Sequence, residues 1–155
     1  MQLQSLLMLA ALAGCSNGTG PGHEPGEAER ASADPERIDR LAGRTWVVDR
    51  IDGSGVTGGA QIELHFVAAD SRVVGTAGCN RFTASYRLTA RNLSIGPVAA
   101  TRKTCQETVM RQERRFIDAL ENTTDFDIDA TGVLVLHGPA GRIRAKASRA
   151  GMPPP

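Results

Sequence analysis

Apolar and polar residues alternate one by one along much of the chain between residues 45 and 147, which is typical of half-buried β-strands. The pattern is clearest at 62–66, where Ile62, Leu64 and Phe66 share one face. Short turns join 62–66 to 72–77, and 82–88 to 92–95, so both pairs are expected to form hairpins. The predicted strands are 45–51, 62–66, 72–77, 82–88, 92–95, 126–129, 133–137 and 143–147, and the last three form a meander.

One segment, 104–122, has the helical period instead. Thr104 and Glu107 have the spacing of a capping box, which predicts a helix start there. The strands before and after this segment predict an α+β fold, mostly β: a curled antiparallel sheet or incomplete barrel with one amphipathic helix packed against it. The apolar residues expected on the buried helical face are Val109, Phe116, Ile117 and Leu120.

The N-terminal apolar run, residues 5–14, is uncharged and far shorter than the roughly 20 residues that span a bilayer. It has the length of a signal-peptide core, and the small residues Ala13 and Gly14 precede Cys15, as in a bacterial lipobox. We therefore expect residues 1–14 to be a lipoprotein signal peptide and Cys15 to carry the lipid. Residues 1–4 lack the usual basic charge, and a buried N-terminal helix is the alternative.

Composition divides the remaining chain. Residues 15–37 are rich in Gly, Pro, Ser, Glu and Ala, and a segment of this kind cannot bury enough apolar surface to offset its ordering entropy. We expect the lipidated Cys15 and a disordered tether there, one domain at 38–148 and a flexible tail at 149–155. Ser16, in place of an inner-membrane retention signal, favours attachment to the outer membrane with the domain facing the periplasm.

Charge and reactive groups exclude several functions. The 18 basic and 17 acidic residues give a net charge of +1, which offers no electrostatic footprint for nucleic acid. No arrangement of side chains forms a recognisable catalytic site or metal site. We expect a monomer that is not an enzyme and has no catalytic residue, metal or cofactor.

Cys79 and Cys105 remain once Cys15 is assigned to the lipid. An even pair in an oxidising compartment favours a disulfide, which would close a loop of about 26 residues and contribute roughly 3 kcal/mol. Two reduced buried cysteines are an alternative. Zinc is a weaker one, because no C-x-x-C or His pair accompanies them. A reduced Cys105 near a helix N-terminus would favour the thiolate.

Three segments, 41–46, 78–86 and 101–105, resemble the META/HslJ domain family. The resemblance rests on Gly-Cys-Asn-Arg-Phe from Gly78 and on Thr-Arg-x-x-Cys from Thr101, and it covers about residues 40–147. Ala84 and the pair Lys103-Thr104 depart from the usual pattern without removing a reactive group. The resemblance implies a β-rich domain with a helix, often on a bacterial lipoprotein, associated with heat shock and novobiocin tolerance. The family is also similar in fold to pilot lipoproteins of secretin channels. The resemblance implies no catalytic activity and no cofactor.

Asn80 and Arg81 lie inside the most distinctive motif. They are candidates for a partner contact; the alternative is that Asn80 bonds backbone groups and Arg81 forms a cap or salt bridge. The expected function is a non-enzymatic envelope lipoprotein, held to the membrane by lipid, that binds an unknown envelope protein or supports stress tolerance. The alternatives are a periplasmic carrier of hydrophobic small molecules and a thiol-based redox protein. A core filled by Phe116, Ile117 and Leu120 would exclude the carrier.

Overall fold

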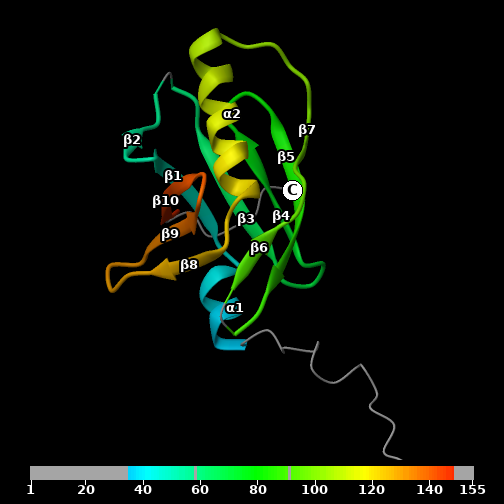
Figure 1. Cartoon of the computed structure of the whole chain (residues 1–155), viewed down its shortest axis with the longest axis vertical. Helices are drawn as coiled ribbons and strands as arrows, with labels where there is room; N and C mark the ends of the chain where they lie inside the picture. The colour runs from blue at the N-terminus through cyan, green and yellow to red at the C-terminus, as the bar shows by residue number, and fades with distance from the viewer. Residues whose placement is uncertain (1–34, 58, 91, 149–155) are drawn as a thin grey trace, which may run out of the picture. The chain divides into compact units, whose positions relative to one another are not determined.

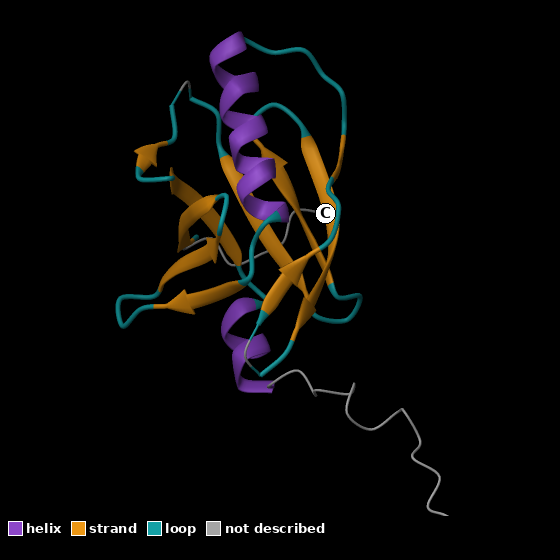
Figure 2. Cartoon of the chain, viewed as in Figure 1, coloured by secondary structure: helices purple, strands orange, loops and turns teal. Residues whose placement is uncertain are grey.

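The computed structural model describes residues 35–57, 59–90 and 92–148 (Figures 1 and 2). The predicted signal peptide, Cys15, the tether up to residue 34 and the tail at 149–155 lie outside the described residues. The elements in chain order are α1 (Pro35–Leu41), β1 (Thr45–Ile51), β2 (Ser54–Gly55), β3 (Ile62–Val67), β4 (Arg72–Ala77), β5 (Arg81–Leu88), β6 (Leu93–Ile95), β7 (Ala99–Ala100), α2 (Glu107–Glu121), β8 (Asp125–Ile128), β9 (Val133–Gly138) and β10 (Gly141–Ala147).

The strands form a nearly closed antiparallel barrel, which confirms the predicted fold class. Their order is β6-β5-β4-β3-β1-β10-β9-β8, with β2 paired to β1 and β7 paired to β5. The two edge strands of this order, β6 and β8, approach each other. The N–H of Leu93 in β6 donates to the carbonyl of Thr124, just before β8, at 3.1 Å. The gap between β6 and β8 is the seam of the barrel.

The alternating pattern correctly identified the strands that form this sheet. Every predicted strand is present, with its ends within two residues of the prediction. Ile62, Leu64 and Phe66 are fully buried, because alternate residues of β3 face the barrel interior. The short strands β2 and β7 were not predicted, because two residues carry no detectable period.

Helix α2 packs one face against the interior of the barrel and leaves its other face exposed. It contacts β1, β4, β6 and β10. Phe116 and Leu120 are fully buried in the same cluster as the inward residues of β3, and Ile117, also predicted to be buried, is only partly buried against it. The ring of Phe116 meets that of Phe82 edge-on, with centroids 5.6 Å apart. Side chains of the helix therefore occupy the space that a carried hydrophobic molecule would need.

The start of α2 differs from the prediction. The helix begins at Glu107, its N-cap is Gln106, and that residue makes no side-chain capping bond. The predicted capping box of Thr104 and Glu107 is wrong. Contacts from the distant turn between β4 and β5, described below, fix the segment before the helix and decide where it begins.

The domain also begins earlier than predicted, with a second helix. Helix α1 includes residues 35–37, which were expected to belong to the tether. Leu41 at its end is fully buried, and its carbonyl accepts a hydrogen bond from the indole N–H of Trp46 at 2.8 Å. Within the described residues, no helix has the length and apolar character needed to cross a membrane.

Candidate functional site

Asn80, in the turn between β4 and β5, is the centre of a buried polar network. Its side-chain oxygen accepts hydrogen bonds from the Thr101 hydroxyl at 2.9 Å and the Lys103 N–H at 2.7 Å. Its amide nitrogen donates to Glu113 at 2.7 Å and to the Lys103 carbonyl at 3.4 Å. The residue is only 2% exposed, and the full hydrogen-bonding capacity of its side chain is used inside the domain.

Glu113, on α2, is the second member of the network and is 5% exposed. One carboxylate oxygen accepts from the Asn80 amide. The other accepts from the backbone N–H groups of Asn80 at 2.8 Å and Cys79 at 3.2 Å. Three donors therefore compensate for the burial of this carboxylate. Glu113 was not among the predicted site residues, although its place on the apolar helical face between Val109 and Phe116 was a usable signal.

A disulfide between Cys79 and Cys105 lies beside this network, and the predicted pair is confirmed. The Cα atoms are 6.1 Å apart, and the bond joins the β4–β5 turn to the segment before α2. It uses both sulfur atoms, so the alternatives of reduced buried cysteines and zinc ligation are wrong. Covalent and polar links thus fix the same two chain segments, 79–81 and 101–105.

These segments carry three cations, Arg81, Arg102 and Lys103, named here the basic patch. All three are exposed. Arg81 and Thr101 hold the segments together: the Thr101 N–H donates to the Arg81 carbonyl at 3.0 Å, and the Arg81 N–H donates to the Thr101 hydroxyl at 3.2 Å. Across the described residues, no ion pair involves the side chains of the basic patch.

The two candidate contact residues therefore have different positions. Asn80 is buried and bonded within the domain, so its role in this structure is structural, and a direct partner contact through its side chain is not supported. The Arg81 side chain is exposed, and its partner contact stays a prediction. Arg102 and Lys103 were not predicted as contact residues, although both lie in the segment 101–105 that carries the family resemblance.

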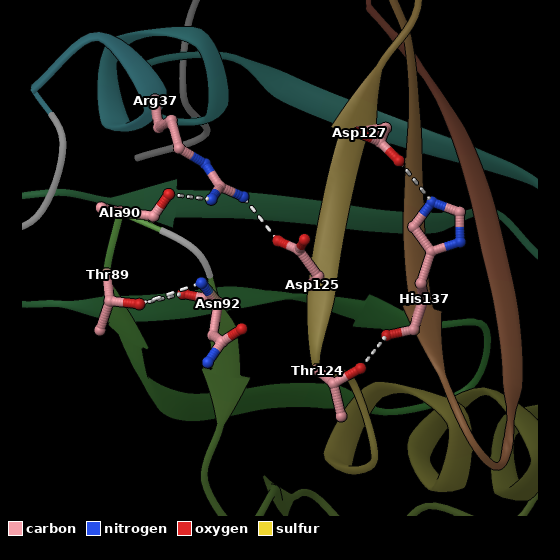
Figure 3. A network of polar contacts seen from close by, with 8 residues as sticks. All are labelled: Arg37, Thr89, Ala90, Asn92, Thr124, Asp125, Asp127 and His137. Atoms are coloured by element: carbon pink, nitrogen blue, oxygen red, sulfur yellow. Dashed lines mark hydrogen bonds and ion pairs between the residues drawn. The ribbon is translucent and has the colours of Figure 1, made fainter.

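A second polar network lies at the barrel seam (Figure 3). Arg37 of α1 contacts Asp125 of β8 and also donates to the Ala90 carbonyl at 2.9 Å. Arg40 donates to the Ile128 carbonyl at 2.7 Å. Arg37, Arg40, Asp125 and Ile128 line a hollow of about 270 Å³ between α1 and β8. Their charged groups already have partners from β8 and its neighbours, so the network joins parts of the domain.

Shifted pKa values occur at two further places among the described residues. The Thr131 hydroxyl and the Val133 N–H bond to Asp129 and lower its pKa. Burial raises the pKa of Tyr86. Asp129 lies in the β8–β9 turn and Tyr86 in the core, so neither belongs to the Asn80 network.

Comparisons with known proteins agree with this architecture. An NMR structure of a protein from Burkholderia xenovorans has a TM-score of 0.58 and 24% identity, and the match covers 76% of this chain and 90% of that one. A second NMR structure has a TM-score of 0.58 and 22% identity, with 70% and 92% covered. A crystal structure of a DUF4847 family protein from Bacteroides vulgatus has a TM-score of 0.51 and 15% identity, with 76% and 99% covered. At these identities the likeness shows a shared fold alone.

The family comparison is more specific. No curated protein sequence matches the chain. The META domain matches residues 39–150, which include the network of Asn80 and Glu113 and the Cys79–Cys105 bond. The chain belongs to the META domain family.

Proposed function

We propose that this protein is a non-enzymatic lipoprotein of the bacterial cell envelope whose META domain binds another envelope protein and supports tolerance of heat or antibiotic stress. Lipid on Cys15 would hold it at the outer membrane with the domain facing the periplasm. The observation that carries this proposal is the Asn80 network. Its polar side chains are bonded to one another, while the segments that they fix present an exposed surface.

A fixed surface suits binding more than chemistry. Asn80 and Glu113 have no hydrogen-bonding group directed to solvent, whereas residues 101–108 are exposed throughout. Binding to a segment held in place in advance avoids the entropy cost of ordering it on contact. The disulfide and the buried carboxylate of Glu113 therefore lower the entropy cost of binding a partner at this surface.

The proposed location is consistent with the chemistry of the domain. A disulfide persists in the periplasm and is rare in the reducing cytosol. The lipobox at Cys15 is independent support, because it depends on residues outside the domain. The carrier alternative loses support, since Phe116 and Leu120 occupy the interior.

The first test addresses attachment. Wild type should incorporate labelled fatty acid and fractionate with outer membranes, whereas Cys15→Ser should do neither. A wild-type protein without lipid would contradict the proposed anchoring.

The second test addresses binding. Chemical cross-linking in the native envelope should join the full-length lipoprotein to a specific protein. An unrelated domain on the same anchor and tether is the control, and recovery of the same proteins with both would contradict the proposed binding function.

A further inference from the structure

We infer that the basic patch of Arg81, Arg102 and Lys103 is the docking surface for an acidic segment of the partner protein. This inference rests on the proposed function and names the chemistry of its contact. It adds two residues and a class of ligand to the prediction for Arg81.

The first support is the way in which the cations are held. Both backbone polar groups of Lys103 are fixed by the Asn80 side chain, and Arg81 pairs with Thr101. The disulfide begins at Cys79, two residues before Arg81, and ends at Cys105, two residues after Lys103. These contacts use backbone atoms of the cations and leave their charged groups outside.

The second support is the charge balance. Elsewhere in the described chain, Arg37, Arg111 and Arg144 have carboxylate partners, whereas single exposed arginines such as Arg87 and Arg114 have none. The basic patch has three cations on two linked segments, and no ion pair involves them among the described residues. The acid beneath it, Glu113, is buried and bonded to amide groups. The strand register places Glu63 two strands away from Arg81, across Thr76. The exposed charge of the patch is therefore positive, and carboxylates complement it with charge-assisted bonds.

The third support is position. The chain enters the domain at α1, and the segment with Arg102 and Lys103 leads from β7 to the start of α2, at the end of the domain away from α1 (Figure 1). The basic patch is therefore separate from the contacts that α1 makes at the barrel seam. The proposed function, binding of an envelope protein, favours an acidic protein segment as the occupant, and the experiment below tests anionic lipid headgroups as the alternative.

The experiment uses the full-length lipoprotein in its native envelope, with a photo-crosslinking amino acid at position 104, an exposed site directly after Lys103. The same amino acid at the exposed position 94 is the site control. The test variant carries R81E, R102E and K103E. R87E with R114E reverses charge at exposed arginines outside the patch, and R81K, R102K and K103R together keep the charge.

We expect position 104 to capture a protein through a peptide rich in Asp and Glu. The triple reversal should lower that yield at least about tenfold, since like charges at an interface repel strongly. The R87E/R114E and charge-keeping variants should retain it. Urea unfolding checks that the triple variant is folded, and added salt should weaken capture by wild type.

The outcomes separate the two proposals. If wild type captures a partner and the triple reversal captures it equally, or if the captured peptide lacks acidic residues, the docking inference is wrong while the binding function stands. If the variant instead loses affinity for phosphatidylglycerol vesicles and wild type captures no protein, the surface is a lipid site and the inference is also wrong. If no exposed position captures a protein above the tethered control, the proposed function itself fails.

Discussion

The guanidinium of Arg37, in α1, lies 2.6 Å from the carboxylate of Asp125, the first residue of β8 and 88 positions later in the chain. The same guanidinium donates to the Ala90 carbonyl in the β5–β6 turn and lies 4.7 Å from the centre of the Phe126 ring. One side chain therefore bridges both sides of the barrel seam, where continuous strand pairing ends.

Replacing Arg37 with Ala should destabilise the seam. Arg37→Ala removes a partly exposed ion pair, a hydrogen bond and a cation–π contact, so the free energy of unfolding should fall by about 1–2 kcal/mol. Urea unfolding of the full-length protein measures the change. Arg87→Ala, at an exposed position, should change it by less than about 0.5 kcal/mol. Equal effects for the two variants would show that Arg37 does not secure the seam.

Removing the Glu113 carboxylate should have a larger effect. Glu113→Ala leaves the N–H groups of Cys79 and Asn80 and the Asn80 amide without their acceptor, which should lower the free energy of unfolding by about 2–4 kcal/mol. Glu113→Gln keeps one accepting oxygen and should lower the free energy of unfolding by about half as much. Asp70→Asn removes one exposed charge as the control, with little change expected. An unchanged free energy of unfolding in Glu113→Ala would contradict this prediction and mean that water replaces the lost acceptor.

The Cys79–Cys105 bond should contribute about 3 kcal/mol through the loop that it closes. Urea unfolding with and without a strong reductant measures this, in a Cys15→Ser background that has no other cysteine. The protein that also carries Cys79→Ser and Cys105→Ser should unfold at the same urea concentration as the reduced Cys15→Ser protein. Added reductant should not change its unfolding. A thiol count should find the bond intact under mild reductant; a bond that opens readily would revive the thiol-based redox alternative.

Asp129 should show a pH dependence that Thr131 controls. Hydrogen bonds from the Thr131 hydroxyl and the Val133 N–H lower the pKa of Asp129, so its ionised form stabilises the fold above the ordinary aspartate pKa. This contribution is lost as the pH falls through the lowered value, below about 4. Thr131→Val should raise the pKa of Asp129 toward the ordinary value in an NMR titration. Thr108→Val, on exposed α2 surface, should leave the pKa unchanged, and an unshifted value in Thr131→Val would contradict the assigned cause.

The barrel strands could be predicted because their period is local. Each inward residue, such as Ile62 or Leu64, is separated from the next by one outward residue, and the sheet buries the inward set. Helix α1 has only Ile38 and Leu41 as large apolar residues, so its first residues resemble the segment predicted to be a tether. Pro35 at its first position was the usable signal.

The polar network could not be predicted from spacing. Asn80 meets Thr101, Lys103 and Glu113, which are 21, 23 and 33 positions away, and only the folded barrel brings them together. The prediction of a capping box at Thr104 and Glu107 was wrong for the same reason. The Cys79–Cys105 bond and the Asn80 contacts set the path of the chain before α2, and these tertiary links override the local preference of Thr104.

The bond between Cys79 and Cys105 also closes a covalent ring that contains β5, β6 and β7. A protease that cuts one peptide bond within this ring, for example in the turn between β5 and β6, leaves both pieces attached to each other. The nicked protein would keep its mass on a non-reducing gel and separate into two fragments only after reduction. The basic patch, whose three cations all lie on the ring, would stay connected to the rest of the chain after such a cut.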